Sequence, residues 1–297
     1  MDLTDVNTLI KRFIDDLKTP QVDAMYDKLP KGKMLRARLV KMIAPGAKDA
    51  DLVAAIIETI HLSSLLHDDV IDEAETRRGE PSINALYSDK HAVMLGDIFY
   101  SKAFFELVDM DKRIAKSVSA AVTKLSLGEL LDVEMGNAFN HDVDAYYNMI
   151  YLKTASLIET TTYCAALLAG KDATAHETFG RNLGLAYQII DDILDVTQDA
   201  KTLGKPAFND YKEGKTTLPY IFMYEALDTA DREKLLGLFK KELGSDEEVW
   251  LRQKLQATEA VEKSKLKAKE LADEAMACVS GDETLVGLIQ TMIGRNY

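Results

Sequence analysis

The stretch IETTTYCAALLAG at 158–170 carries apolar residues around most of its circumference when it is drawn as a helix. A helix that is apolar on every side is stable inside a large helical assembly, where none of its faces meets water. The same helical period recurs along almost the whole chain, and no alternating run is long enough to predict a sheet. The sequence therefore predicts an all-α fold, a large helical bundle that forms one domain over residues 1–297.

Breaks in this period, marked by Gly and Pro, divide the chain into helices. The expected ranges are 5–18, 33–44, 50–76, 90–109, 112–138, 143–169, 174–199, 216–227, 230–242, 246–279 with one break, and 282–293. The longest irregular stretch is 201–219, which contains four lysines and directly follows an acidic motif. Such a loop suits a lid over phosphate groups, and the alternative is an ordinary solvated connection.

Bulk composition excludes several classes of function. The net charge of −13 argues against nucleic acid as a partner, because that binding depends on a basic surface. Two cysteines are too few for a disulfide framework, and Cys164 in its apolar run is expected to be a buried thiol in a reducing compartment. The N-terminus lacks a signal-peptide profile, and no apolar stretch approaches the length that spans a bilayer. We therefore expect a cytoplasmic protein without stable membrane insertion.

The pattern Asp-Asp-x-x-Asp occurs twice, once starting at Asp68 and once at Asp191. Residues i and i+4 of a helix lie on one face, so Asp68 is stacked over Asp72, and Asp191 over Asp195. Two such faces turned toward each other would gather four carboxylates, whose repulsion only cations can neutralise. Mg²⁺ suits this arrangement, since it takes a few carboxylates and completes its shell with water and phosphate oxygens. One copy could be an ordinary solvated face, but both copies follow apolar, core-like runs.

Positive charge accompanies these motifs. Arg77 and Arg78 follow the first motif, and Lys33 and Arg36 open an early helix whose free N–H groups favour a phosphate. Lys153 interrupts an otherwise uncharged stretch and is either a snorkelling surface residue or a phosphate ligand.

His61 lies on the helix of the first motif, and two interpretations of it stay open. A neutral imidazole can donate to a phosphate oxygen, and the alternative is a hydrogen-bonded core histidine. With five His and no Cys/His spacing, a zinc site is not expected. The chain contains no GxSxG, HExxH, Rossmann or Walker pattern, so nothing points to acyl transfer, zinc hydrolysis, dinucleotide redox chemistry or work driven by nucleotide hydrolysis.

Taken in order, these motifs resemble the trans-isoprenyl diphosphate synthases, or polyprenyl synthetases, and most of all the bacterial long-chain octaprenyl type. The resemblance rests on GKMLR from residue 32, DDVID with the following RRG, KTA from residue 153, YQIIDDILD, GKxxxxD, and EGKTTLP ending at residue 219. It implies the isoprenoid synthase type of fold, a helical bundle around a central apolar cavity, usually as a homodimer. It also implies a Mg²⁺-dependent prenyltransferase that condenses isopentenyl diphosphate with an allylic diphosphate.

The resemblance further implies a role for each matching residue. Isopentenyl diphosphate would be held by Gly32, Lys33, Arg36, His61 and Arg78. The allylic diphosphate would be held by Arg77, Lys153, Thr154, Gln188, Lys205 and Lys215. Mg²⁺ would be carried by Asp68, Asp72 and Asp191, with Asp195 and Asp69 in support. The catalytic set would be Asp68, Asp69, Asp72, Arg77, Lys153, Asp191, Asp192 and Lys205. The chain departs from the pattern at Asp132, where many relatives carry Gln.

Product length is expected to depend on the helix that leads to Asp68. Ser64 lies one turn before Asp68, with Ser63 beside it and Ile60 deeper, and each turn rises about 5.4 Å. Aromatic side chains here would stop the product early, whereas two serines leave a tunnel open. We therefore expect a product of about C40 for quinone side chains, with a short-chain farnesyl or geranylgeranyl synthase as the alternative.

Three other classes of protein compete with this interpretation. A class I terpene cyclase would usually replace the second aspartate motif and would not need GKxxR with RRG. A non-catalytic subunit of a heteromeric synthase would generally have lost the aspartate motifs, and both are intact here. An acidic helical scaffold would not explain basic residues beside each motif.

Overall fold

The computed structural model describes residues 1–198 and 208–294. Helices make up nearly all of the regular structure in these residues, and the strands found there are β1 (Thr76–Arg77) and β2 (Glu80–Pro81), which form one antiparallel hairpin. The all-α prediction is therefore confirmed. Backbone contacts divide the chain into two compact units, one made of residues 1–123 and 157–180, the other of 124–156 and 181–297.

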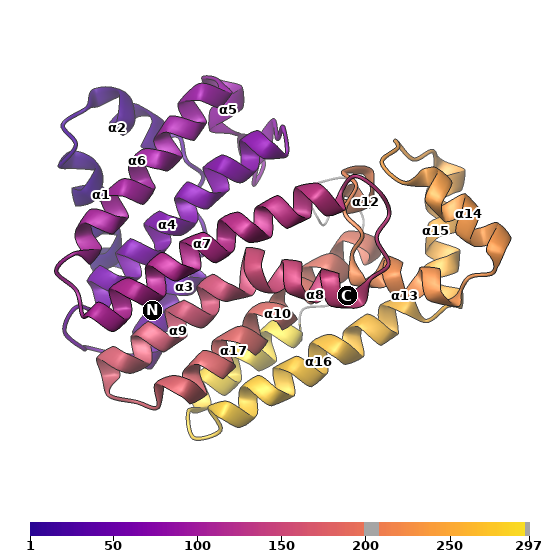
Figure 1. The fold of residues 1–297 in the computed structure, drawn as a ribbon. Helices are drawn as coiled ribbons and strands as arrows, with labels where there is room; N and C mark the ends of the chain where they lie inside the picture. Colours follow the sequence, from indigo (N-terminus) through magenta and orange to yellow (C-terminus); the bar gives the residue numbers. More distant parts are fainter. Residues whose placement is uncertain (199–207, 295–297) are drawn as a thin grey trace. The chain divides into compact units, whose positions relative to one another are not determined.

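The first unit is built on α4 (Ala50–Ile71), against which α1 (Thr4–Asp15), α3 (Leu35–Ile43) and α6 (Asp89–Leu107) pack (Figure 1). This packing buries α4 on several sides, as its apolar sequence predicts. The unit also contains α2 (Pro20–Tyr26), α5 (Ile83–Leu86), the start of α7 (Lys112–Met135), most of α9 (Ser156–Ala169) and the start of α10 (Ala173–Thr197). The short α2 and α5 were not expected from the helical period.

By length and composition, α4 is able to cross a membrane, contrary to the expectation that no apolar stretch is long enough. However, 61% of its apolar window is buried inside the structure. Burial of this kind is typical of the central helix of a folded core. The apolar character of α4 is thus accounted for by the helices packed around it.

The helix that carries the first aspartate motif ends at Ile71 and not at residue 76 as expected. Glu73 adopts a left-handed conformation with φ of 50°. The N–H of Ala74 donates to Asp69 O at 2.8 Å, and the N–H of Glu73 donates to Val70 O at 3.3 Å. These two bonds define a Schellman end, which is usually made with Gly, and because Glu stands at this position no glycine marks the end of the helix.

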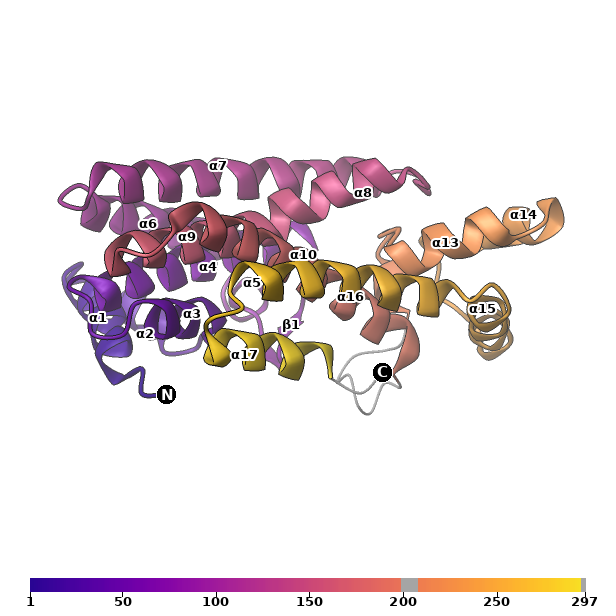
Figure 2. The same ribbon diagram turned by 90° about the horizontal axis from the view of Figure 1, so that it is seen from below.

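The second unit contains the end of α7, α8 (Val143–Ile150) and the rest of α10. It also contains α12 (Asn209–Lys212), α13 (Leu218–Ala226), α14 (Thr229–Leu238), α15 (Ser245–Ala257), α16 (Ala260–Cys278) and α17 (Glu283–Ile293). The long α16 packs against α13, α15 and α17, and Figure 2 shows α17 running beside it.

Two expectations about the second unit are wrong. The helix expected over 143–169 is interrupted by a π-helical turn at Tyr151–Ala155. The irregular stretch expected over 201–219 contains one short helix, α12, which starts between Phe208 and Tyr211, two residues that are fully buried in an aromatic core; residues 213–217 are irregular, as expected. The first half of that stretch, residues 201–207, lies outside the described residues, so the lid hypothesis is not addressed there.

Candidate active site

Three arginines of the first unit lie near enough to His61 to act on it electrostatically. The pKa of His61 is held well below its ordinary value, first by burial and then by the charges of Arg36, Arg78 and Arg77. His61 comes from α4, Arg36 from α3, and the other two arginines from the β1–β2 hairpin. GKxxR and RRG, far apart in sequence, are thereby brought to one place around a neutral histidine.

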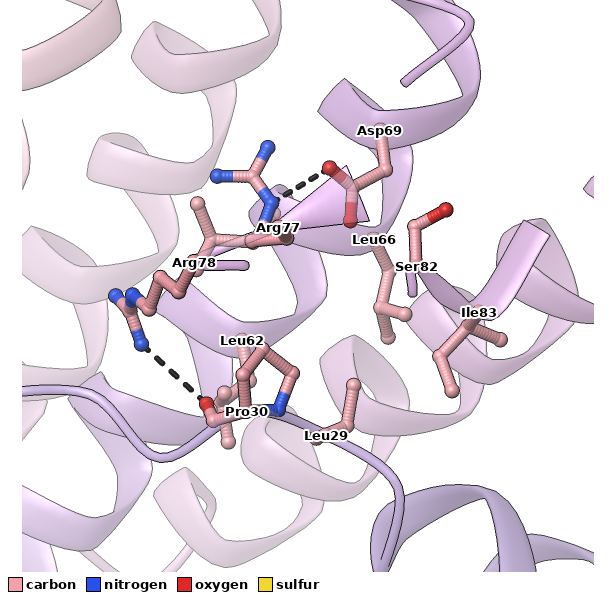
Figure 3. A pocket seen from close by; sticks show the side chains of 10 residues that line it. Leu29, Pro30, Leu62, Leu66, Asp69, Arg77, Arg78, Ser82 and Ile83 are labelled. Carbon is pink, nitrogen blue, oxygen red and sulfur yellow. Dashed lines mark hydrogen bonds and ion pairs between the residues drawn. The ribbon is translucent and has the colours of Figure 1, made fainter. Parts of the chain in front are cut away.

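The hairpin turn places Arg78 against the GKxxR segment. Arg78 and Gly79 both have positive φ, 56° and 80°, as in a type I′ turn. Arg78 Nη1 donates to Pro30 O at 3.3 Å (Figure 3). A Cβ on Gly32 would lie 2.6 Å from the same nitrogen, so only glycine lets the guanidinium lie this close to the backbone. A non-glycine residue held at positive φ is strained, which is typical of functional sites.

The start of α3 differs from the expectation that its free N–H groups face a phosphate. Glu58, a residue of α4 that we did not select from the sequence, accepts a hydrogen bond at Oε1 from the N–H of Ala37 at 2.8 Å. This helix end is therefore occupied by a carboxylate from the protein itself. Burial raises the pKa of Glu58, while Arg36 and the N–H groups of α3 oppose that rise.

The three aspartates of the first motif have different surroundings. Asp69 is buried, and its Oδ1 accepts from Arg77 Nε at 2.5 Å (Figure 3). Burial raises the pKa of Asp69 and the charge of Arg77 opposes the rise. Asp68 is partly accessible and Asp72 is exposed. The N–H of Asp72 still donates to Asp68 O at 2.8 Å, so these two acids lie one turn apart at the end of α4, as predicted.

In the second motif, Asp192 is the centre of a buried network. Tyr146 Oη donates to its Oδ2 at 2.5 Å, and Gln188 Nε2 donates to its Oδ1 at 2.9 Å. Thr154 Oγ1 in turn donates to Gln188 Oε1 at 2.8 Å. Burial, followed by the charge of Asp210, raises the pKa of Asp192 well above its ordinary value. Thr154 and Gln188, predicted to hold the allylic diphosphate, are thus oriented by each other and by this acid.

The outer acids of the second motif also differ from each other. Asp191 is exposed, whereas Asp195 is 1% exposed. Asp195 Oδ2 accepts from the N–H of Asp210 at 3.2 Å, and its carbonyl accepts from the N–H of Phe208. Asp195 therefore fixes the segment that leads into α12, and Asp210 is a further acid near this motif.

The first motif belongs to the first unit and the second motif to the second unit. Across residues 1–198 and 208–294, no group of three or more acidic, His or Cys side chains is close enough to hold a metal ion. The accessible acids, Asp68, Asp72 and Asp191, nevertheless supply the oxygen ligands that Mg²⁺ prefers.

Lys153 and Thr154 lie in the π-helical turn. Lys153 Nζ pairs with Glu129 Oε2 at 2.8 Å and with Asp132 Oδ2 at 2.5 Å, both on α7. Asp132 is the position that departs from the family pattern, and it is a direct partner of this lysine. Neither of the open interpretations of Lys153 foresaw these two carboxylates, because α7 and the turn are distant in sequence.

The remaining predicted residues are placed as follows. Lys205 lies outside the described residues. Lys215 Nζ pairs with Glu213 at 2.9 Å, and its N–H donates to Asp210 O. Lys33 is exposed just before α3. Ile60 is fully buried.

The two serines expected to line the product tunnel have different orientations. Ser63 is fully buried, and its Oγ donates to Gly96 O on α6 at 2.6 Å. Ser64 is partly accessible, and its Oγ donates to His61 O at 2.9 Å. Ser63 thus joins α4 to α6, and Ser64 is the better candidate for a tunnel wall.

The depressed pKa of His61 predicts a dependence of stability on pH. In the unfolded chain His61 takes up a proton near pH 6.5, whereas in the folded protein it stays neutral. The unfolded state then binds more protons, so acidification below this pH lowers the free energy of unfolding by at most about 1.4 kcal/mol per pH unit. Urea unfolding between pH 5 and 7 should show a steeper fall of the free energy of unfolding on acidification in the wild type than in His61→Gln, because other groups contribute equally to both. Parallel curves for the two proteins would contradict the prediction.

Comparison with known proteins places these motifs in context. A model of the family described as "Polyprenyl synthetase" matches residues 19–255. The short chain isoprenyl diphosphate synthase of Methanothermobacter thermautotrophicus is 38% identical over 231 residues, 73% of this chain and 69% of that protein. The octaprenyl diphosphate synthase of Escherichia coli is 32% identical over 254 residues, 82% of this chain and 79% of that protein. The crystal structure of octaprenyl pyrophosphate synthase from Helicobacter pylori aligns with a TM-score of 0.94 and 41% identity, covering 99% of this chain and 100% of that one.

Proposed function

Because the chain belongs to the polyprenyl synthetase family and is a prenyltransferase, we propose that it condenses isopentenyl diphosphate head-to-tail with an allylic diphosphate such as farnesyl diphosphate. The observation that carries this proposal is the group of three arginines that act on His61. Three guanidinium groups beside a neutral imidazole suit a diphosphate, since arginine binds phosphate oxygens in a bidentate manner and a neutral imidazole can donate a further hydrogen bond. In the proposal the whole chain, 1–297, acts as one polyprenyl synthetase domain.

The division of labour among the side chains follows from their surroundings. Arg36, Arg78, Lys33 and His61, with Gly32 making room, would hold isopentenyl diphosphate. Arg77 is fixed by Asp69, and Thr154 by Gln188, so both are oriented before an allylic diphosphate arrives. Preorganised donors of this kind stabilise the charge that develops on a leaving group.

Asp68, Asp72 and Asp191 are the residues that would hold Mg²⁺, with Asp195 and Asp69 in support. When bound, Mg²⁺ would neutralise charge on the departing pyrophosphate and so favour ionisation of the allylic C–O bond. The alkene of isopentenyl diphosphate would then attack the allylic cation, and the released pyrophosphate would accept the proton. A central apolar cavity would exclude water from the cation.

We propose a long-chain product of about C40. Support comes from Ser64, which is small where an aromatic residue would block growth, and from similarity to two octaprenyl synthases. The test is to incubate the protein with farnesyl diphosphate, isopentenyl diphosphate and Mg²⁺ and to size the products. Ser64→Phe should shorten the product, while Ser64→Ala should leave its length unchanged. Termination of the wild type at C15 or C20 would refute the long-chain proposal in favour of the short-chain alternative.

The proposal includes a homodimer in the cytoplasm. One face of α6 exposes large apolar side chains, among them Met94 and Phe105, and a second copy of the chain would cover it. Both cysteines are free, as is usual in a reducing compartment.

A further inference from the structure

The carboxylate of Glu58 is unusual because it is buried among groups that would bind an anion. Glu58 lies on α4 and is 5% exposed to solvent. It lies close to Arg36, and Arg78 also acts on it electrostatically. A negative charge beside these arginines weakens their attraction for a diphosphate, so Glu58 does not serve to attract that ligand.

Glu58 instead contacts the start of α3. The residue before this helix, Met34, has a left-handed backbone with φ of 50° and ψ of 51°, and its side chain makes no capping bond. Glu58 supplies the missing cap, because its Oε1 accepts from the N–H of Ala37 at 2.8 Å and the N–H of Arg36 is directed at the same carboxylate. An anion at a helix start satisfies N–H groups that otherwise have no partner.

The same contact fixes the spacing of two diphosphate ligands. Glu58 and His61 are three residues apart on α4 and therefore share one face of that helix. Arg36 directly precedes Ala37, whose N–H is bonded to Glu58. Glu58 thus ties the residue that carries one guanidinium to the helix that carries the imidazole.

We infer that Glu58 is a positioning residue of the isopentenyl diphosphate site, which holds the start of α3 so that Arg36 and His61 face the same ligand. The inference rests on the proposed function, since it assumes that these two residues bind that substrate. Glu58 touches no reacting atom in this role and acts through Arg36. Its oxygen atom, more than its charge, is what the role requires.

The test compares three substitutions by steady-state kinetics with each substrate varied in turn. Glu58→Ala removes the cap and should raise KM for isopentenyl diphosphate about tenfold or more, while kcat and KM for the allylic diphosphate stay within about twofold. Glu58→Gln keeps an oxygen acceptor for Ala37 and should stay within about threefold of the wild type in every parameter. Glu58→Asp keeps the charge but shortens the side chain, so it should resemble Glu58→Ala and replaces it if that variant does not fold.

A matched control exists between the same two helices. Lys41 Nζ, near the end of α3, pairs with Asp51 Oδ1 on α4 at 2.6 Å, whereas Arg36 lies near the start of α3. Asp51→Ala removes this link and should leave KM for isopentenyl diphosphate unchanged. Thermal unfolding of every variant separates loss of stability from loss of binding.

Several results would overturn the inference. One is an equal KM for isopentenyl diphosphate in Glu58→Ala and Asp51→Ala. Another is a rise of KM for isopentenyl diphosphate in Glu58→Gln as large as that in Glu58→Ala, which would assign the effect to the charge of Glu58. A fall in KM on removing Glu58 would show that it opposes binding. Failure of the proposed function is distinguishable, because the wild type would then form no condensation product.

Discussion

Replacement of Asp68 by Ala should lower kcat for prenyl transfer by about three orders of magnitude or more. Asp68 is a partly accessible acid at the end of α4, one turn from exposed Asp72, and we propose that it holds Mg²⁺. Without it, Asp72 and Asp191 would hold Mg²⁺ less well, so charge on the departing pyrophosphate would be less stabilised. The measurement is release of pyrophosphate by the purified protein at saturating Mg²⁺ and both substrates.

The control for this prediction is Asp89→Ala, which removes one exposed negative charge from the first turn of α6. It should keep wild-type kcat and an unchanged dependence on Mg²⁺. Asp191→Ala should reproduce the loss seen in Asp68→Ala. Activity above about a tenth of wild type in either motif variant would contradict the assigned roles. Loss of one contact that stabilises the transition state in this way lowers kcat by far more than tenfold.

Replacement of Gly128 by Ala should damage both stability and catalysis. A Cβ at this position on α7 would collide with the backbone N of Lys153 and would lie 2.7 Å from the carbonyl carbon of Leu152. These are backbone atoms of the π-helical turn, and they cannot rotate away as a side chain can. We expect the free energy of unfolding to fall by about 2–3 kcal/mol. We also expect kcat to fall by about a hundredfold, because Lys153 and Thr154 would be displaced.

Gly237→Ala is the matched control, since a Cβ there meets nothing within 4 Å. It lies in α14 and should be neutral or stabilise by up to about 1 kcal/mol, as expected when Ala replaces Gly in a helix. Urea unfolding and kcat are measured for both variants. Wild-type stability and kcat in Gly128→Ala would show that the π-helical turn tolerates displacement and does not position the two residues.

Much of the fold could be predicted because helical period is a local signal. The starts of α4, α7 and α8 fall at or beside the expected residues. The end of α4 could not be predicted, because Glu73 occupies a position with a left-handed backbone, where Gly is usually found. The π-helical turn at Tyr151–Ala155 was also missed, since its sequence continues the apolar run on either side.

The motifs identified the reacting groups but not the residues that orient them. Glu58 is a single acid in an apolar run of the sequence, and Ala37, whose N–H donates to it, lies in another helix. The same is true of Tyr146, whose bond to Asp192 joins α8 to α10. Contacts between distant segments leave no periodic pattern, so they cannot be predicted from a single sequence. Burial of Asp192 and Asp195 likewise depends on packing that only the structure supplies.

The central claim is that acids from both aspartate motifs jointly bind the divalent ions that activate the allylic diphosphate. The most direct measurement is a crystal structure grown with Mn²⁺ and a thio-diphosphate analogue of farnesyl diphosphate, with the metal located by anomalous scattering. We predict Mn²⁺ between the analogue and the carboxylates of Asp68, Asp72 and Asp191. Anomalous peaks elsewhere, or a bound analogue with neither motif near a metal, would contradict the account.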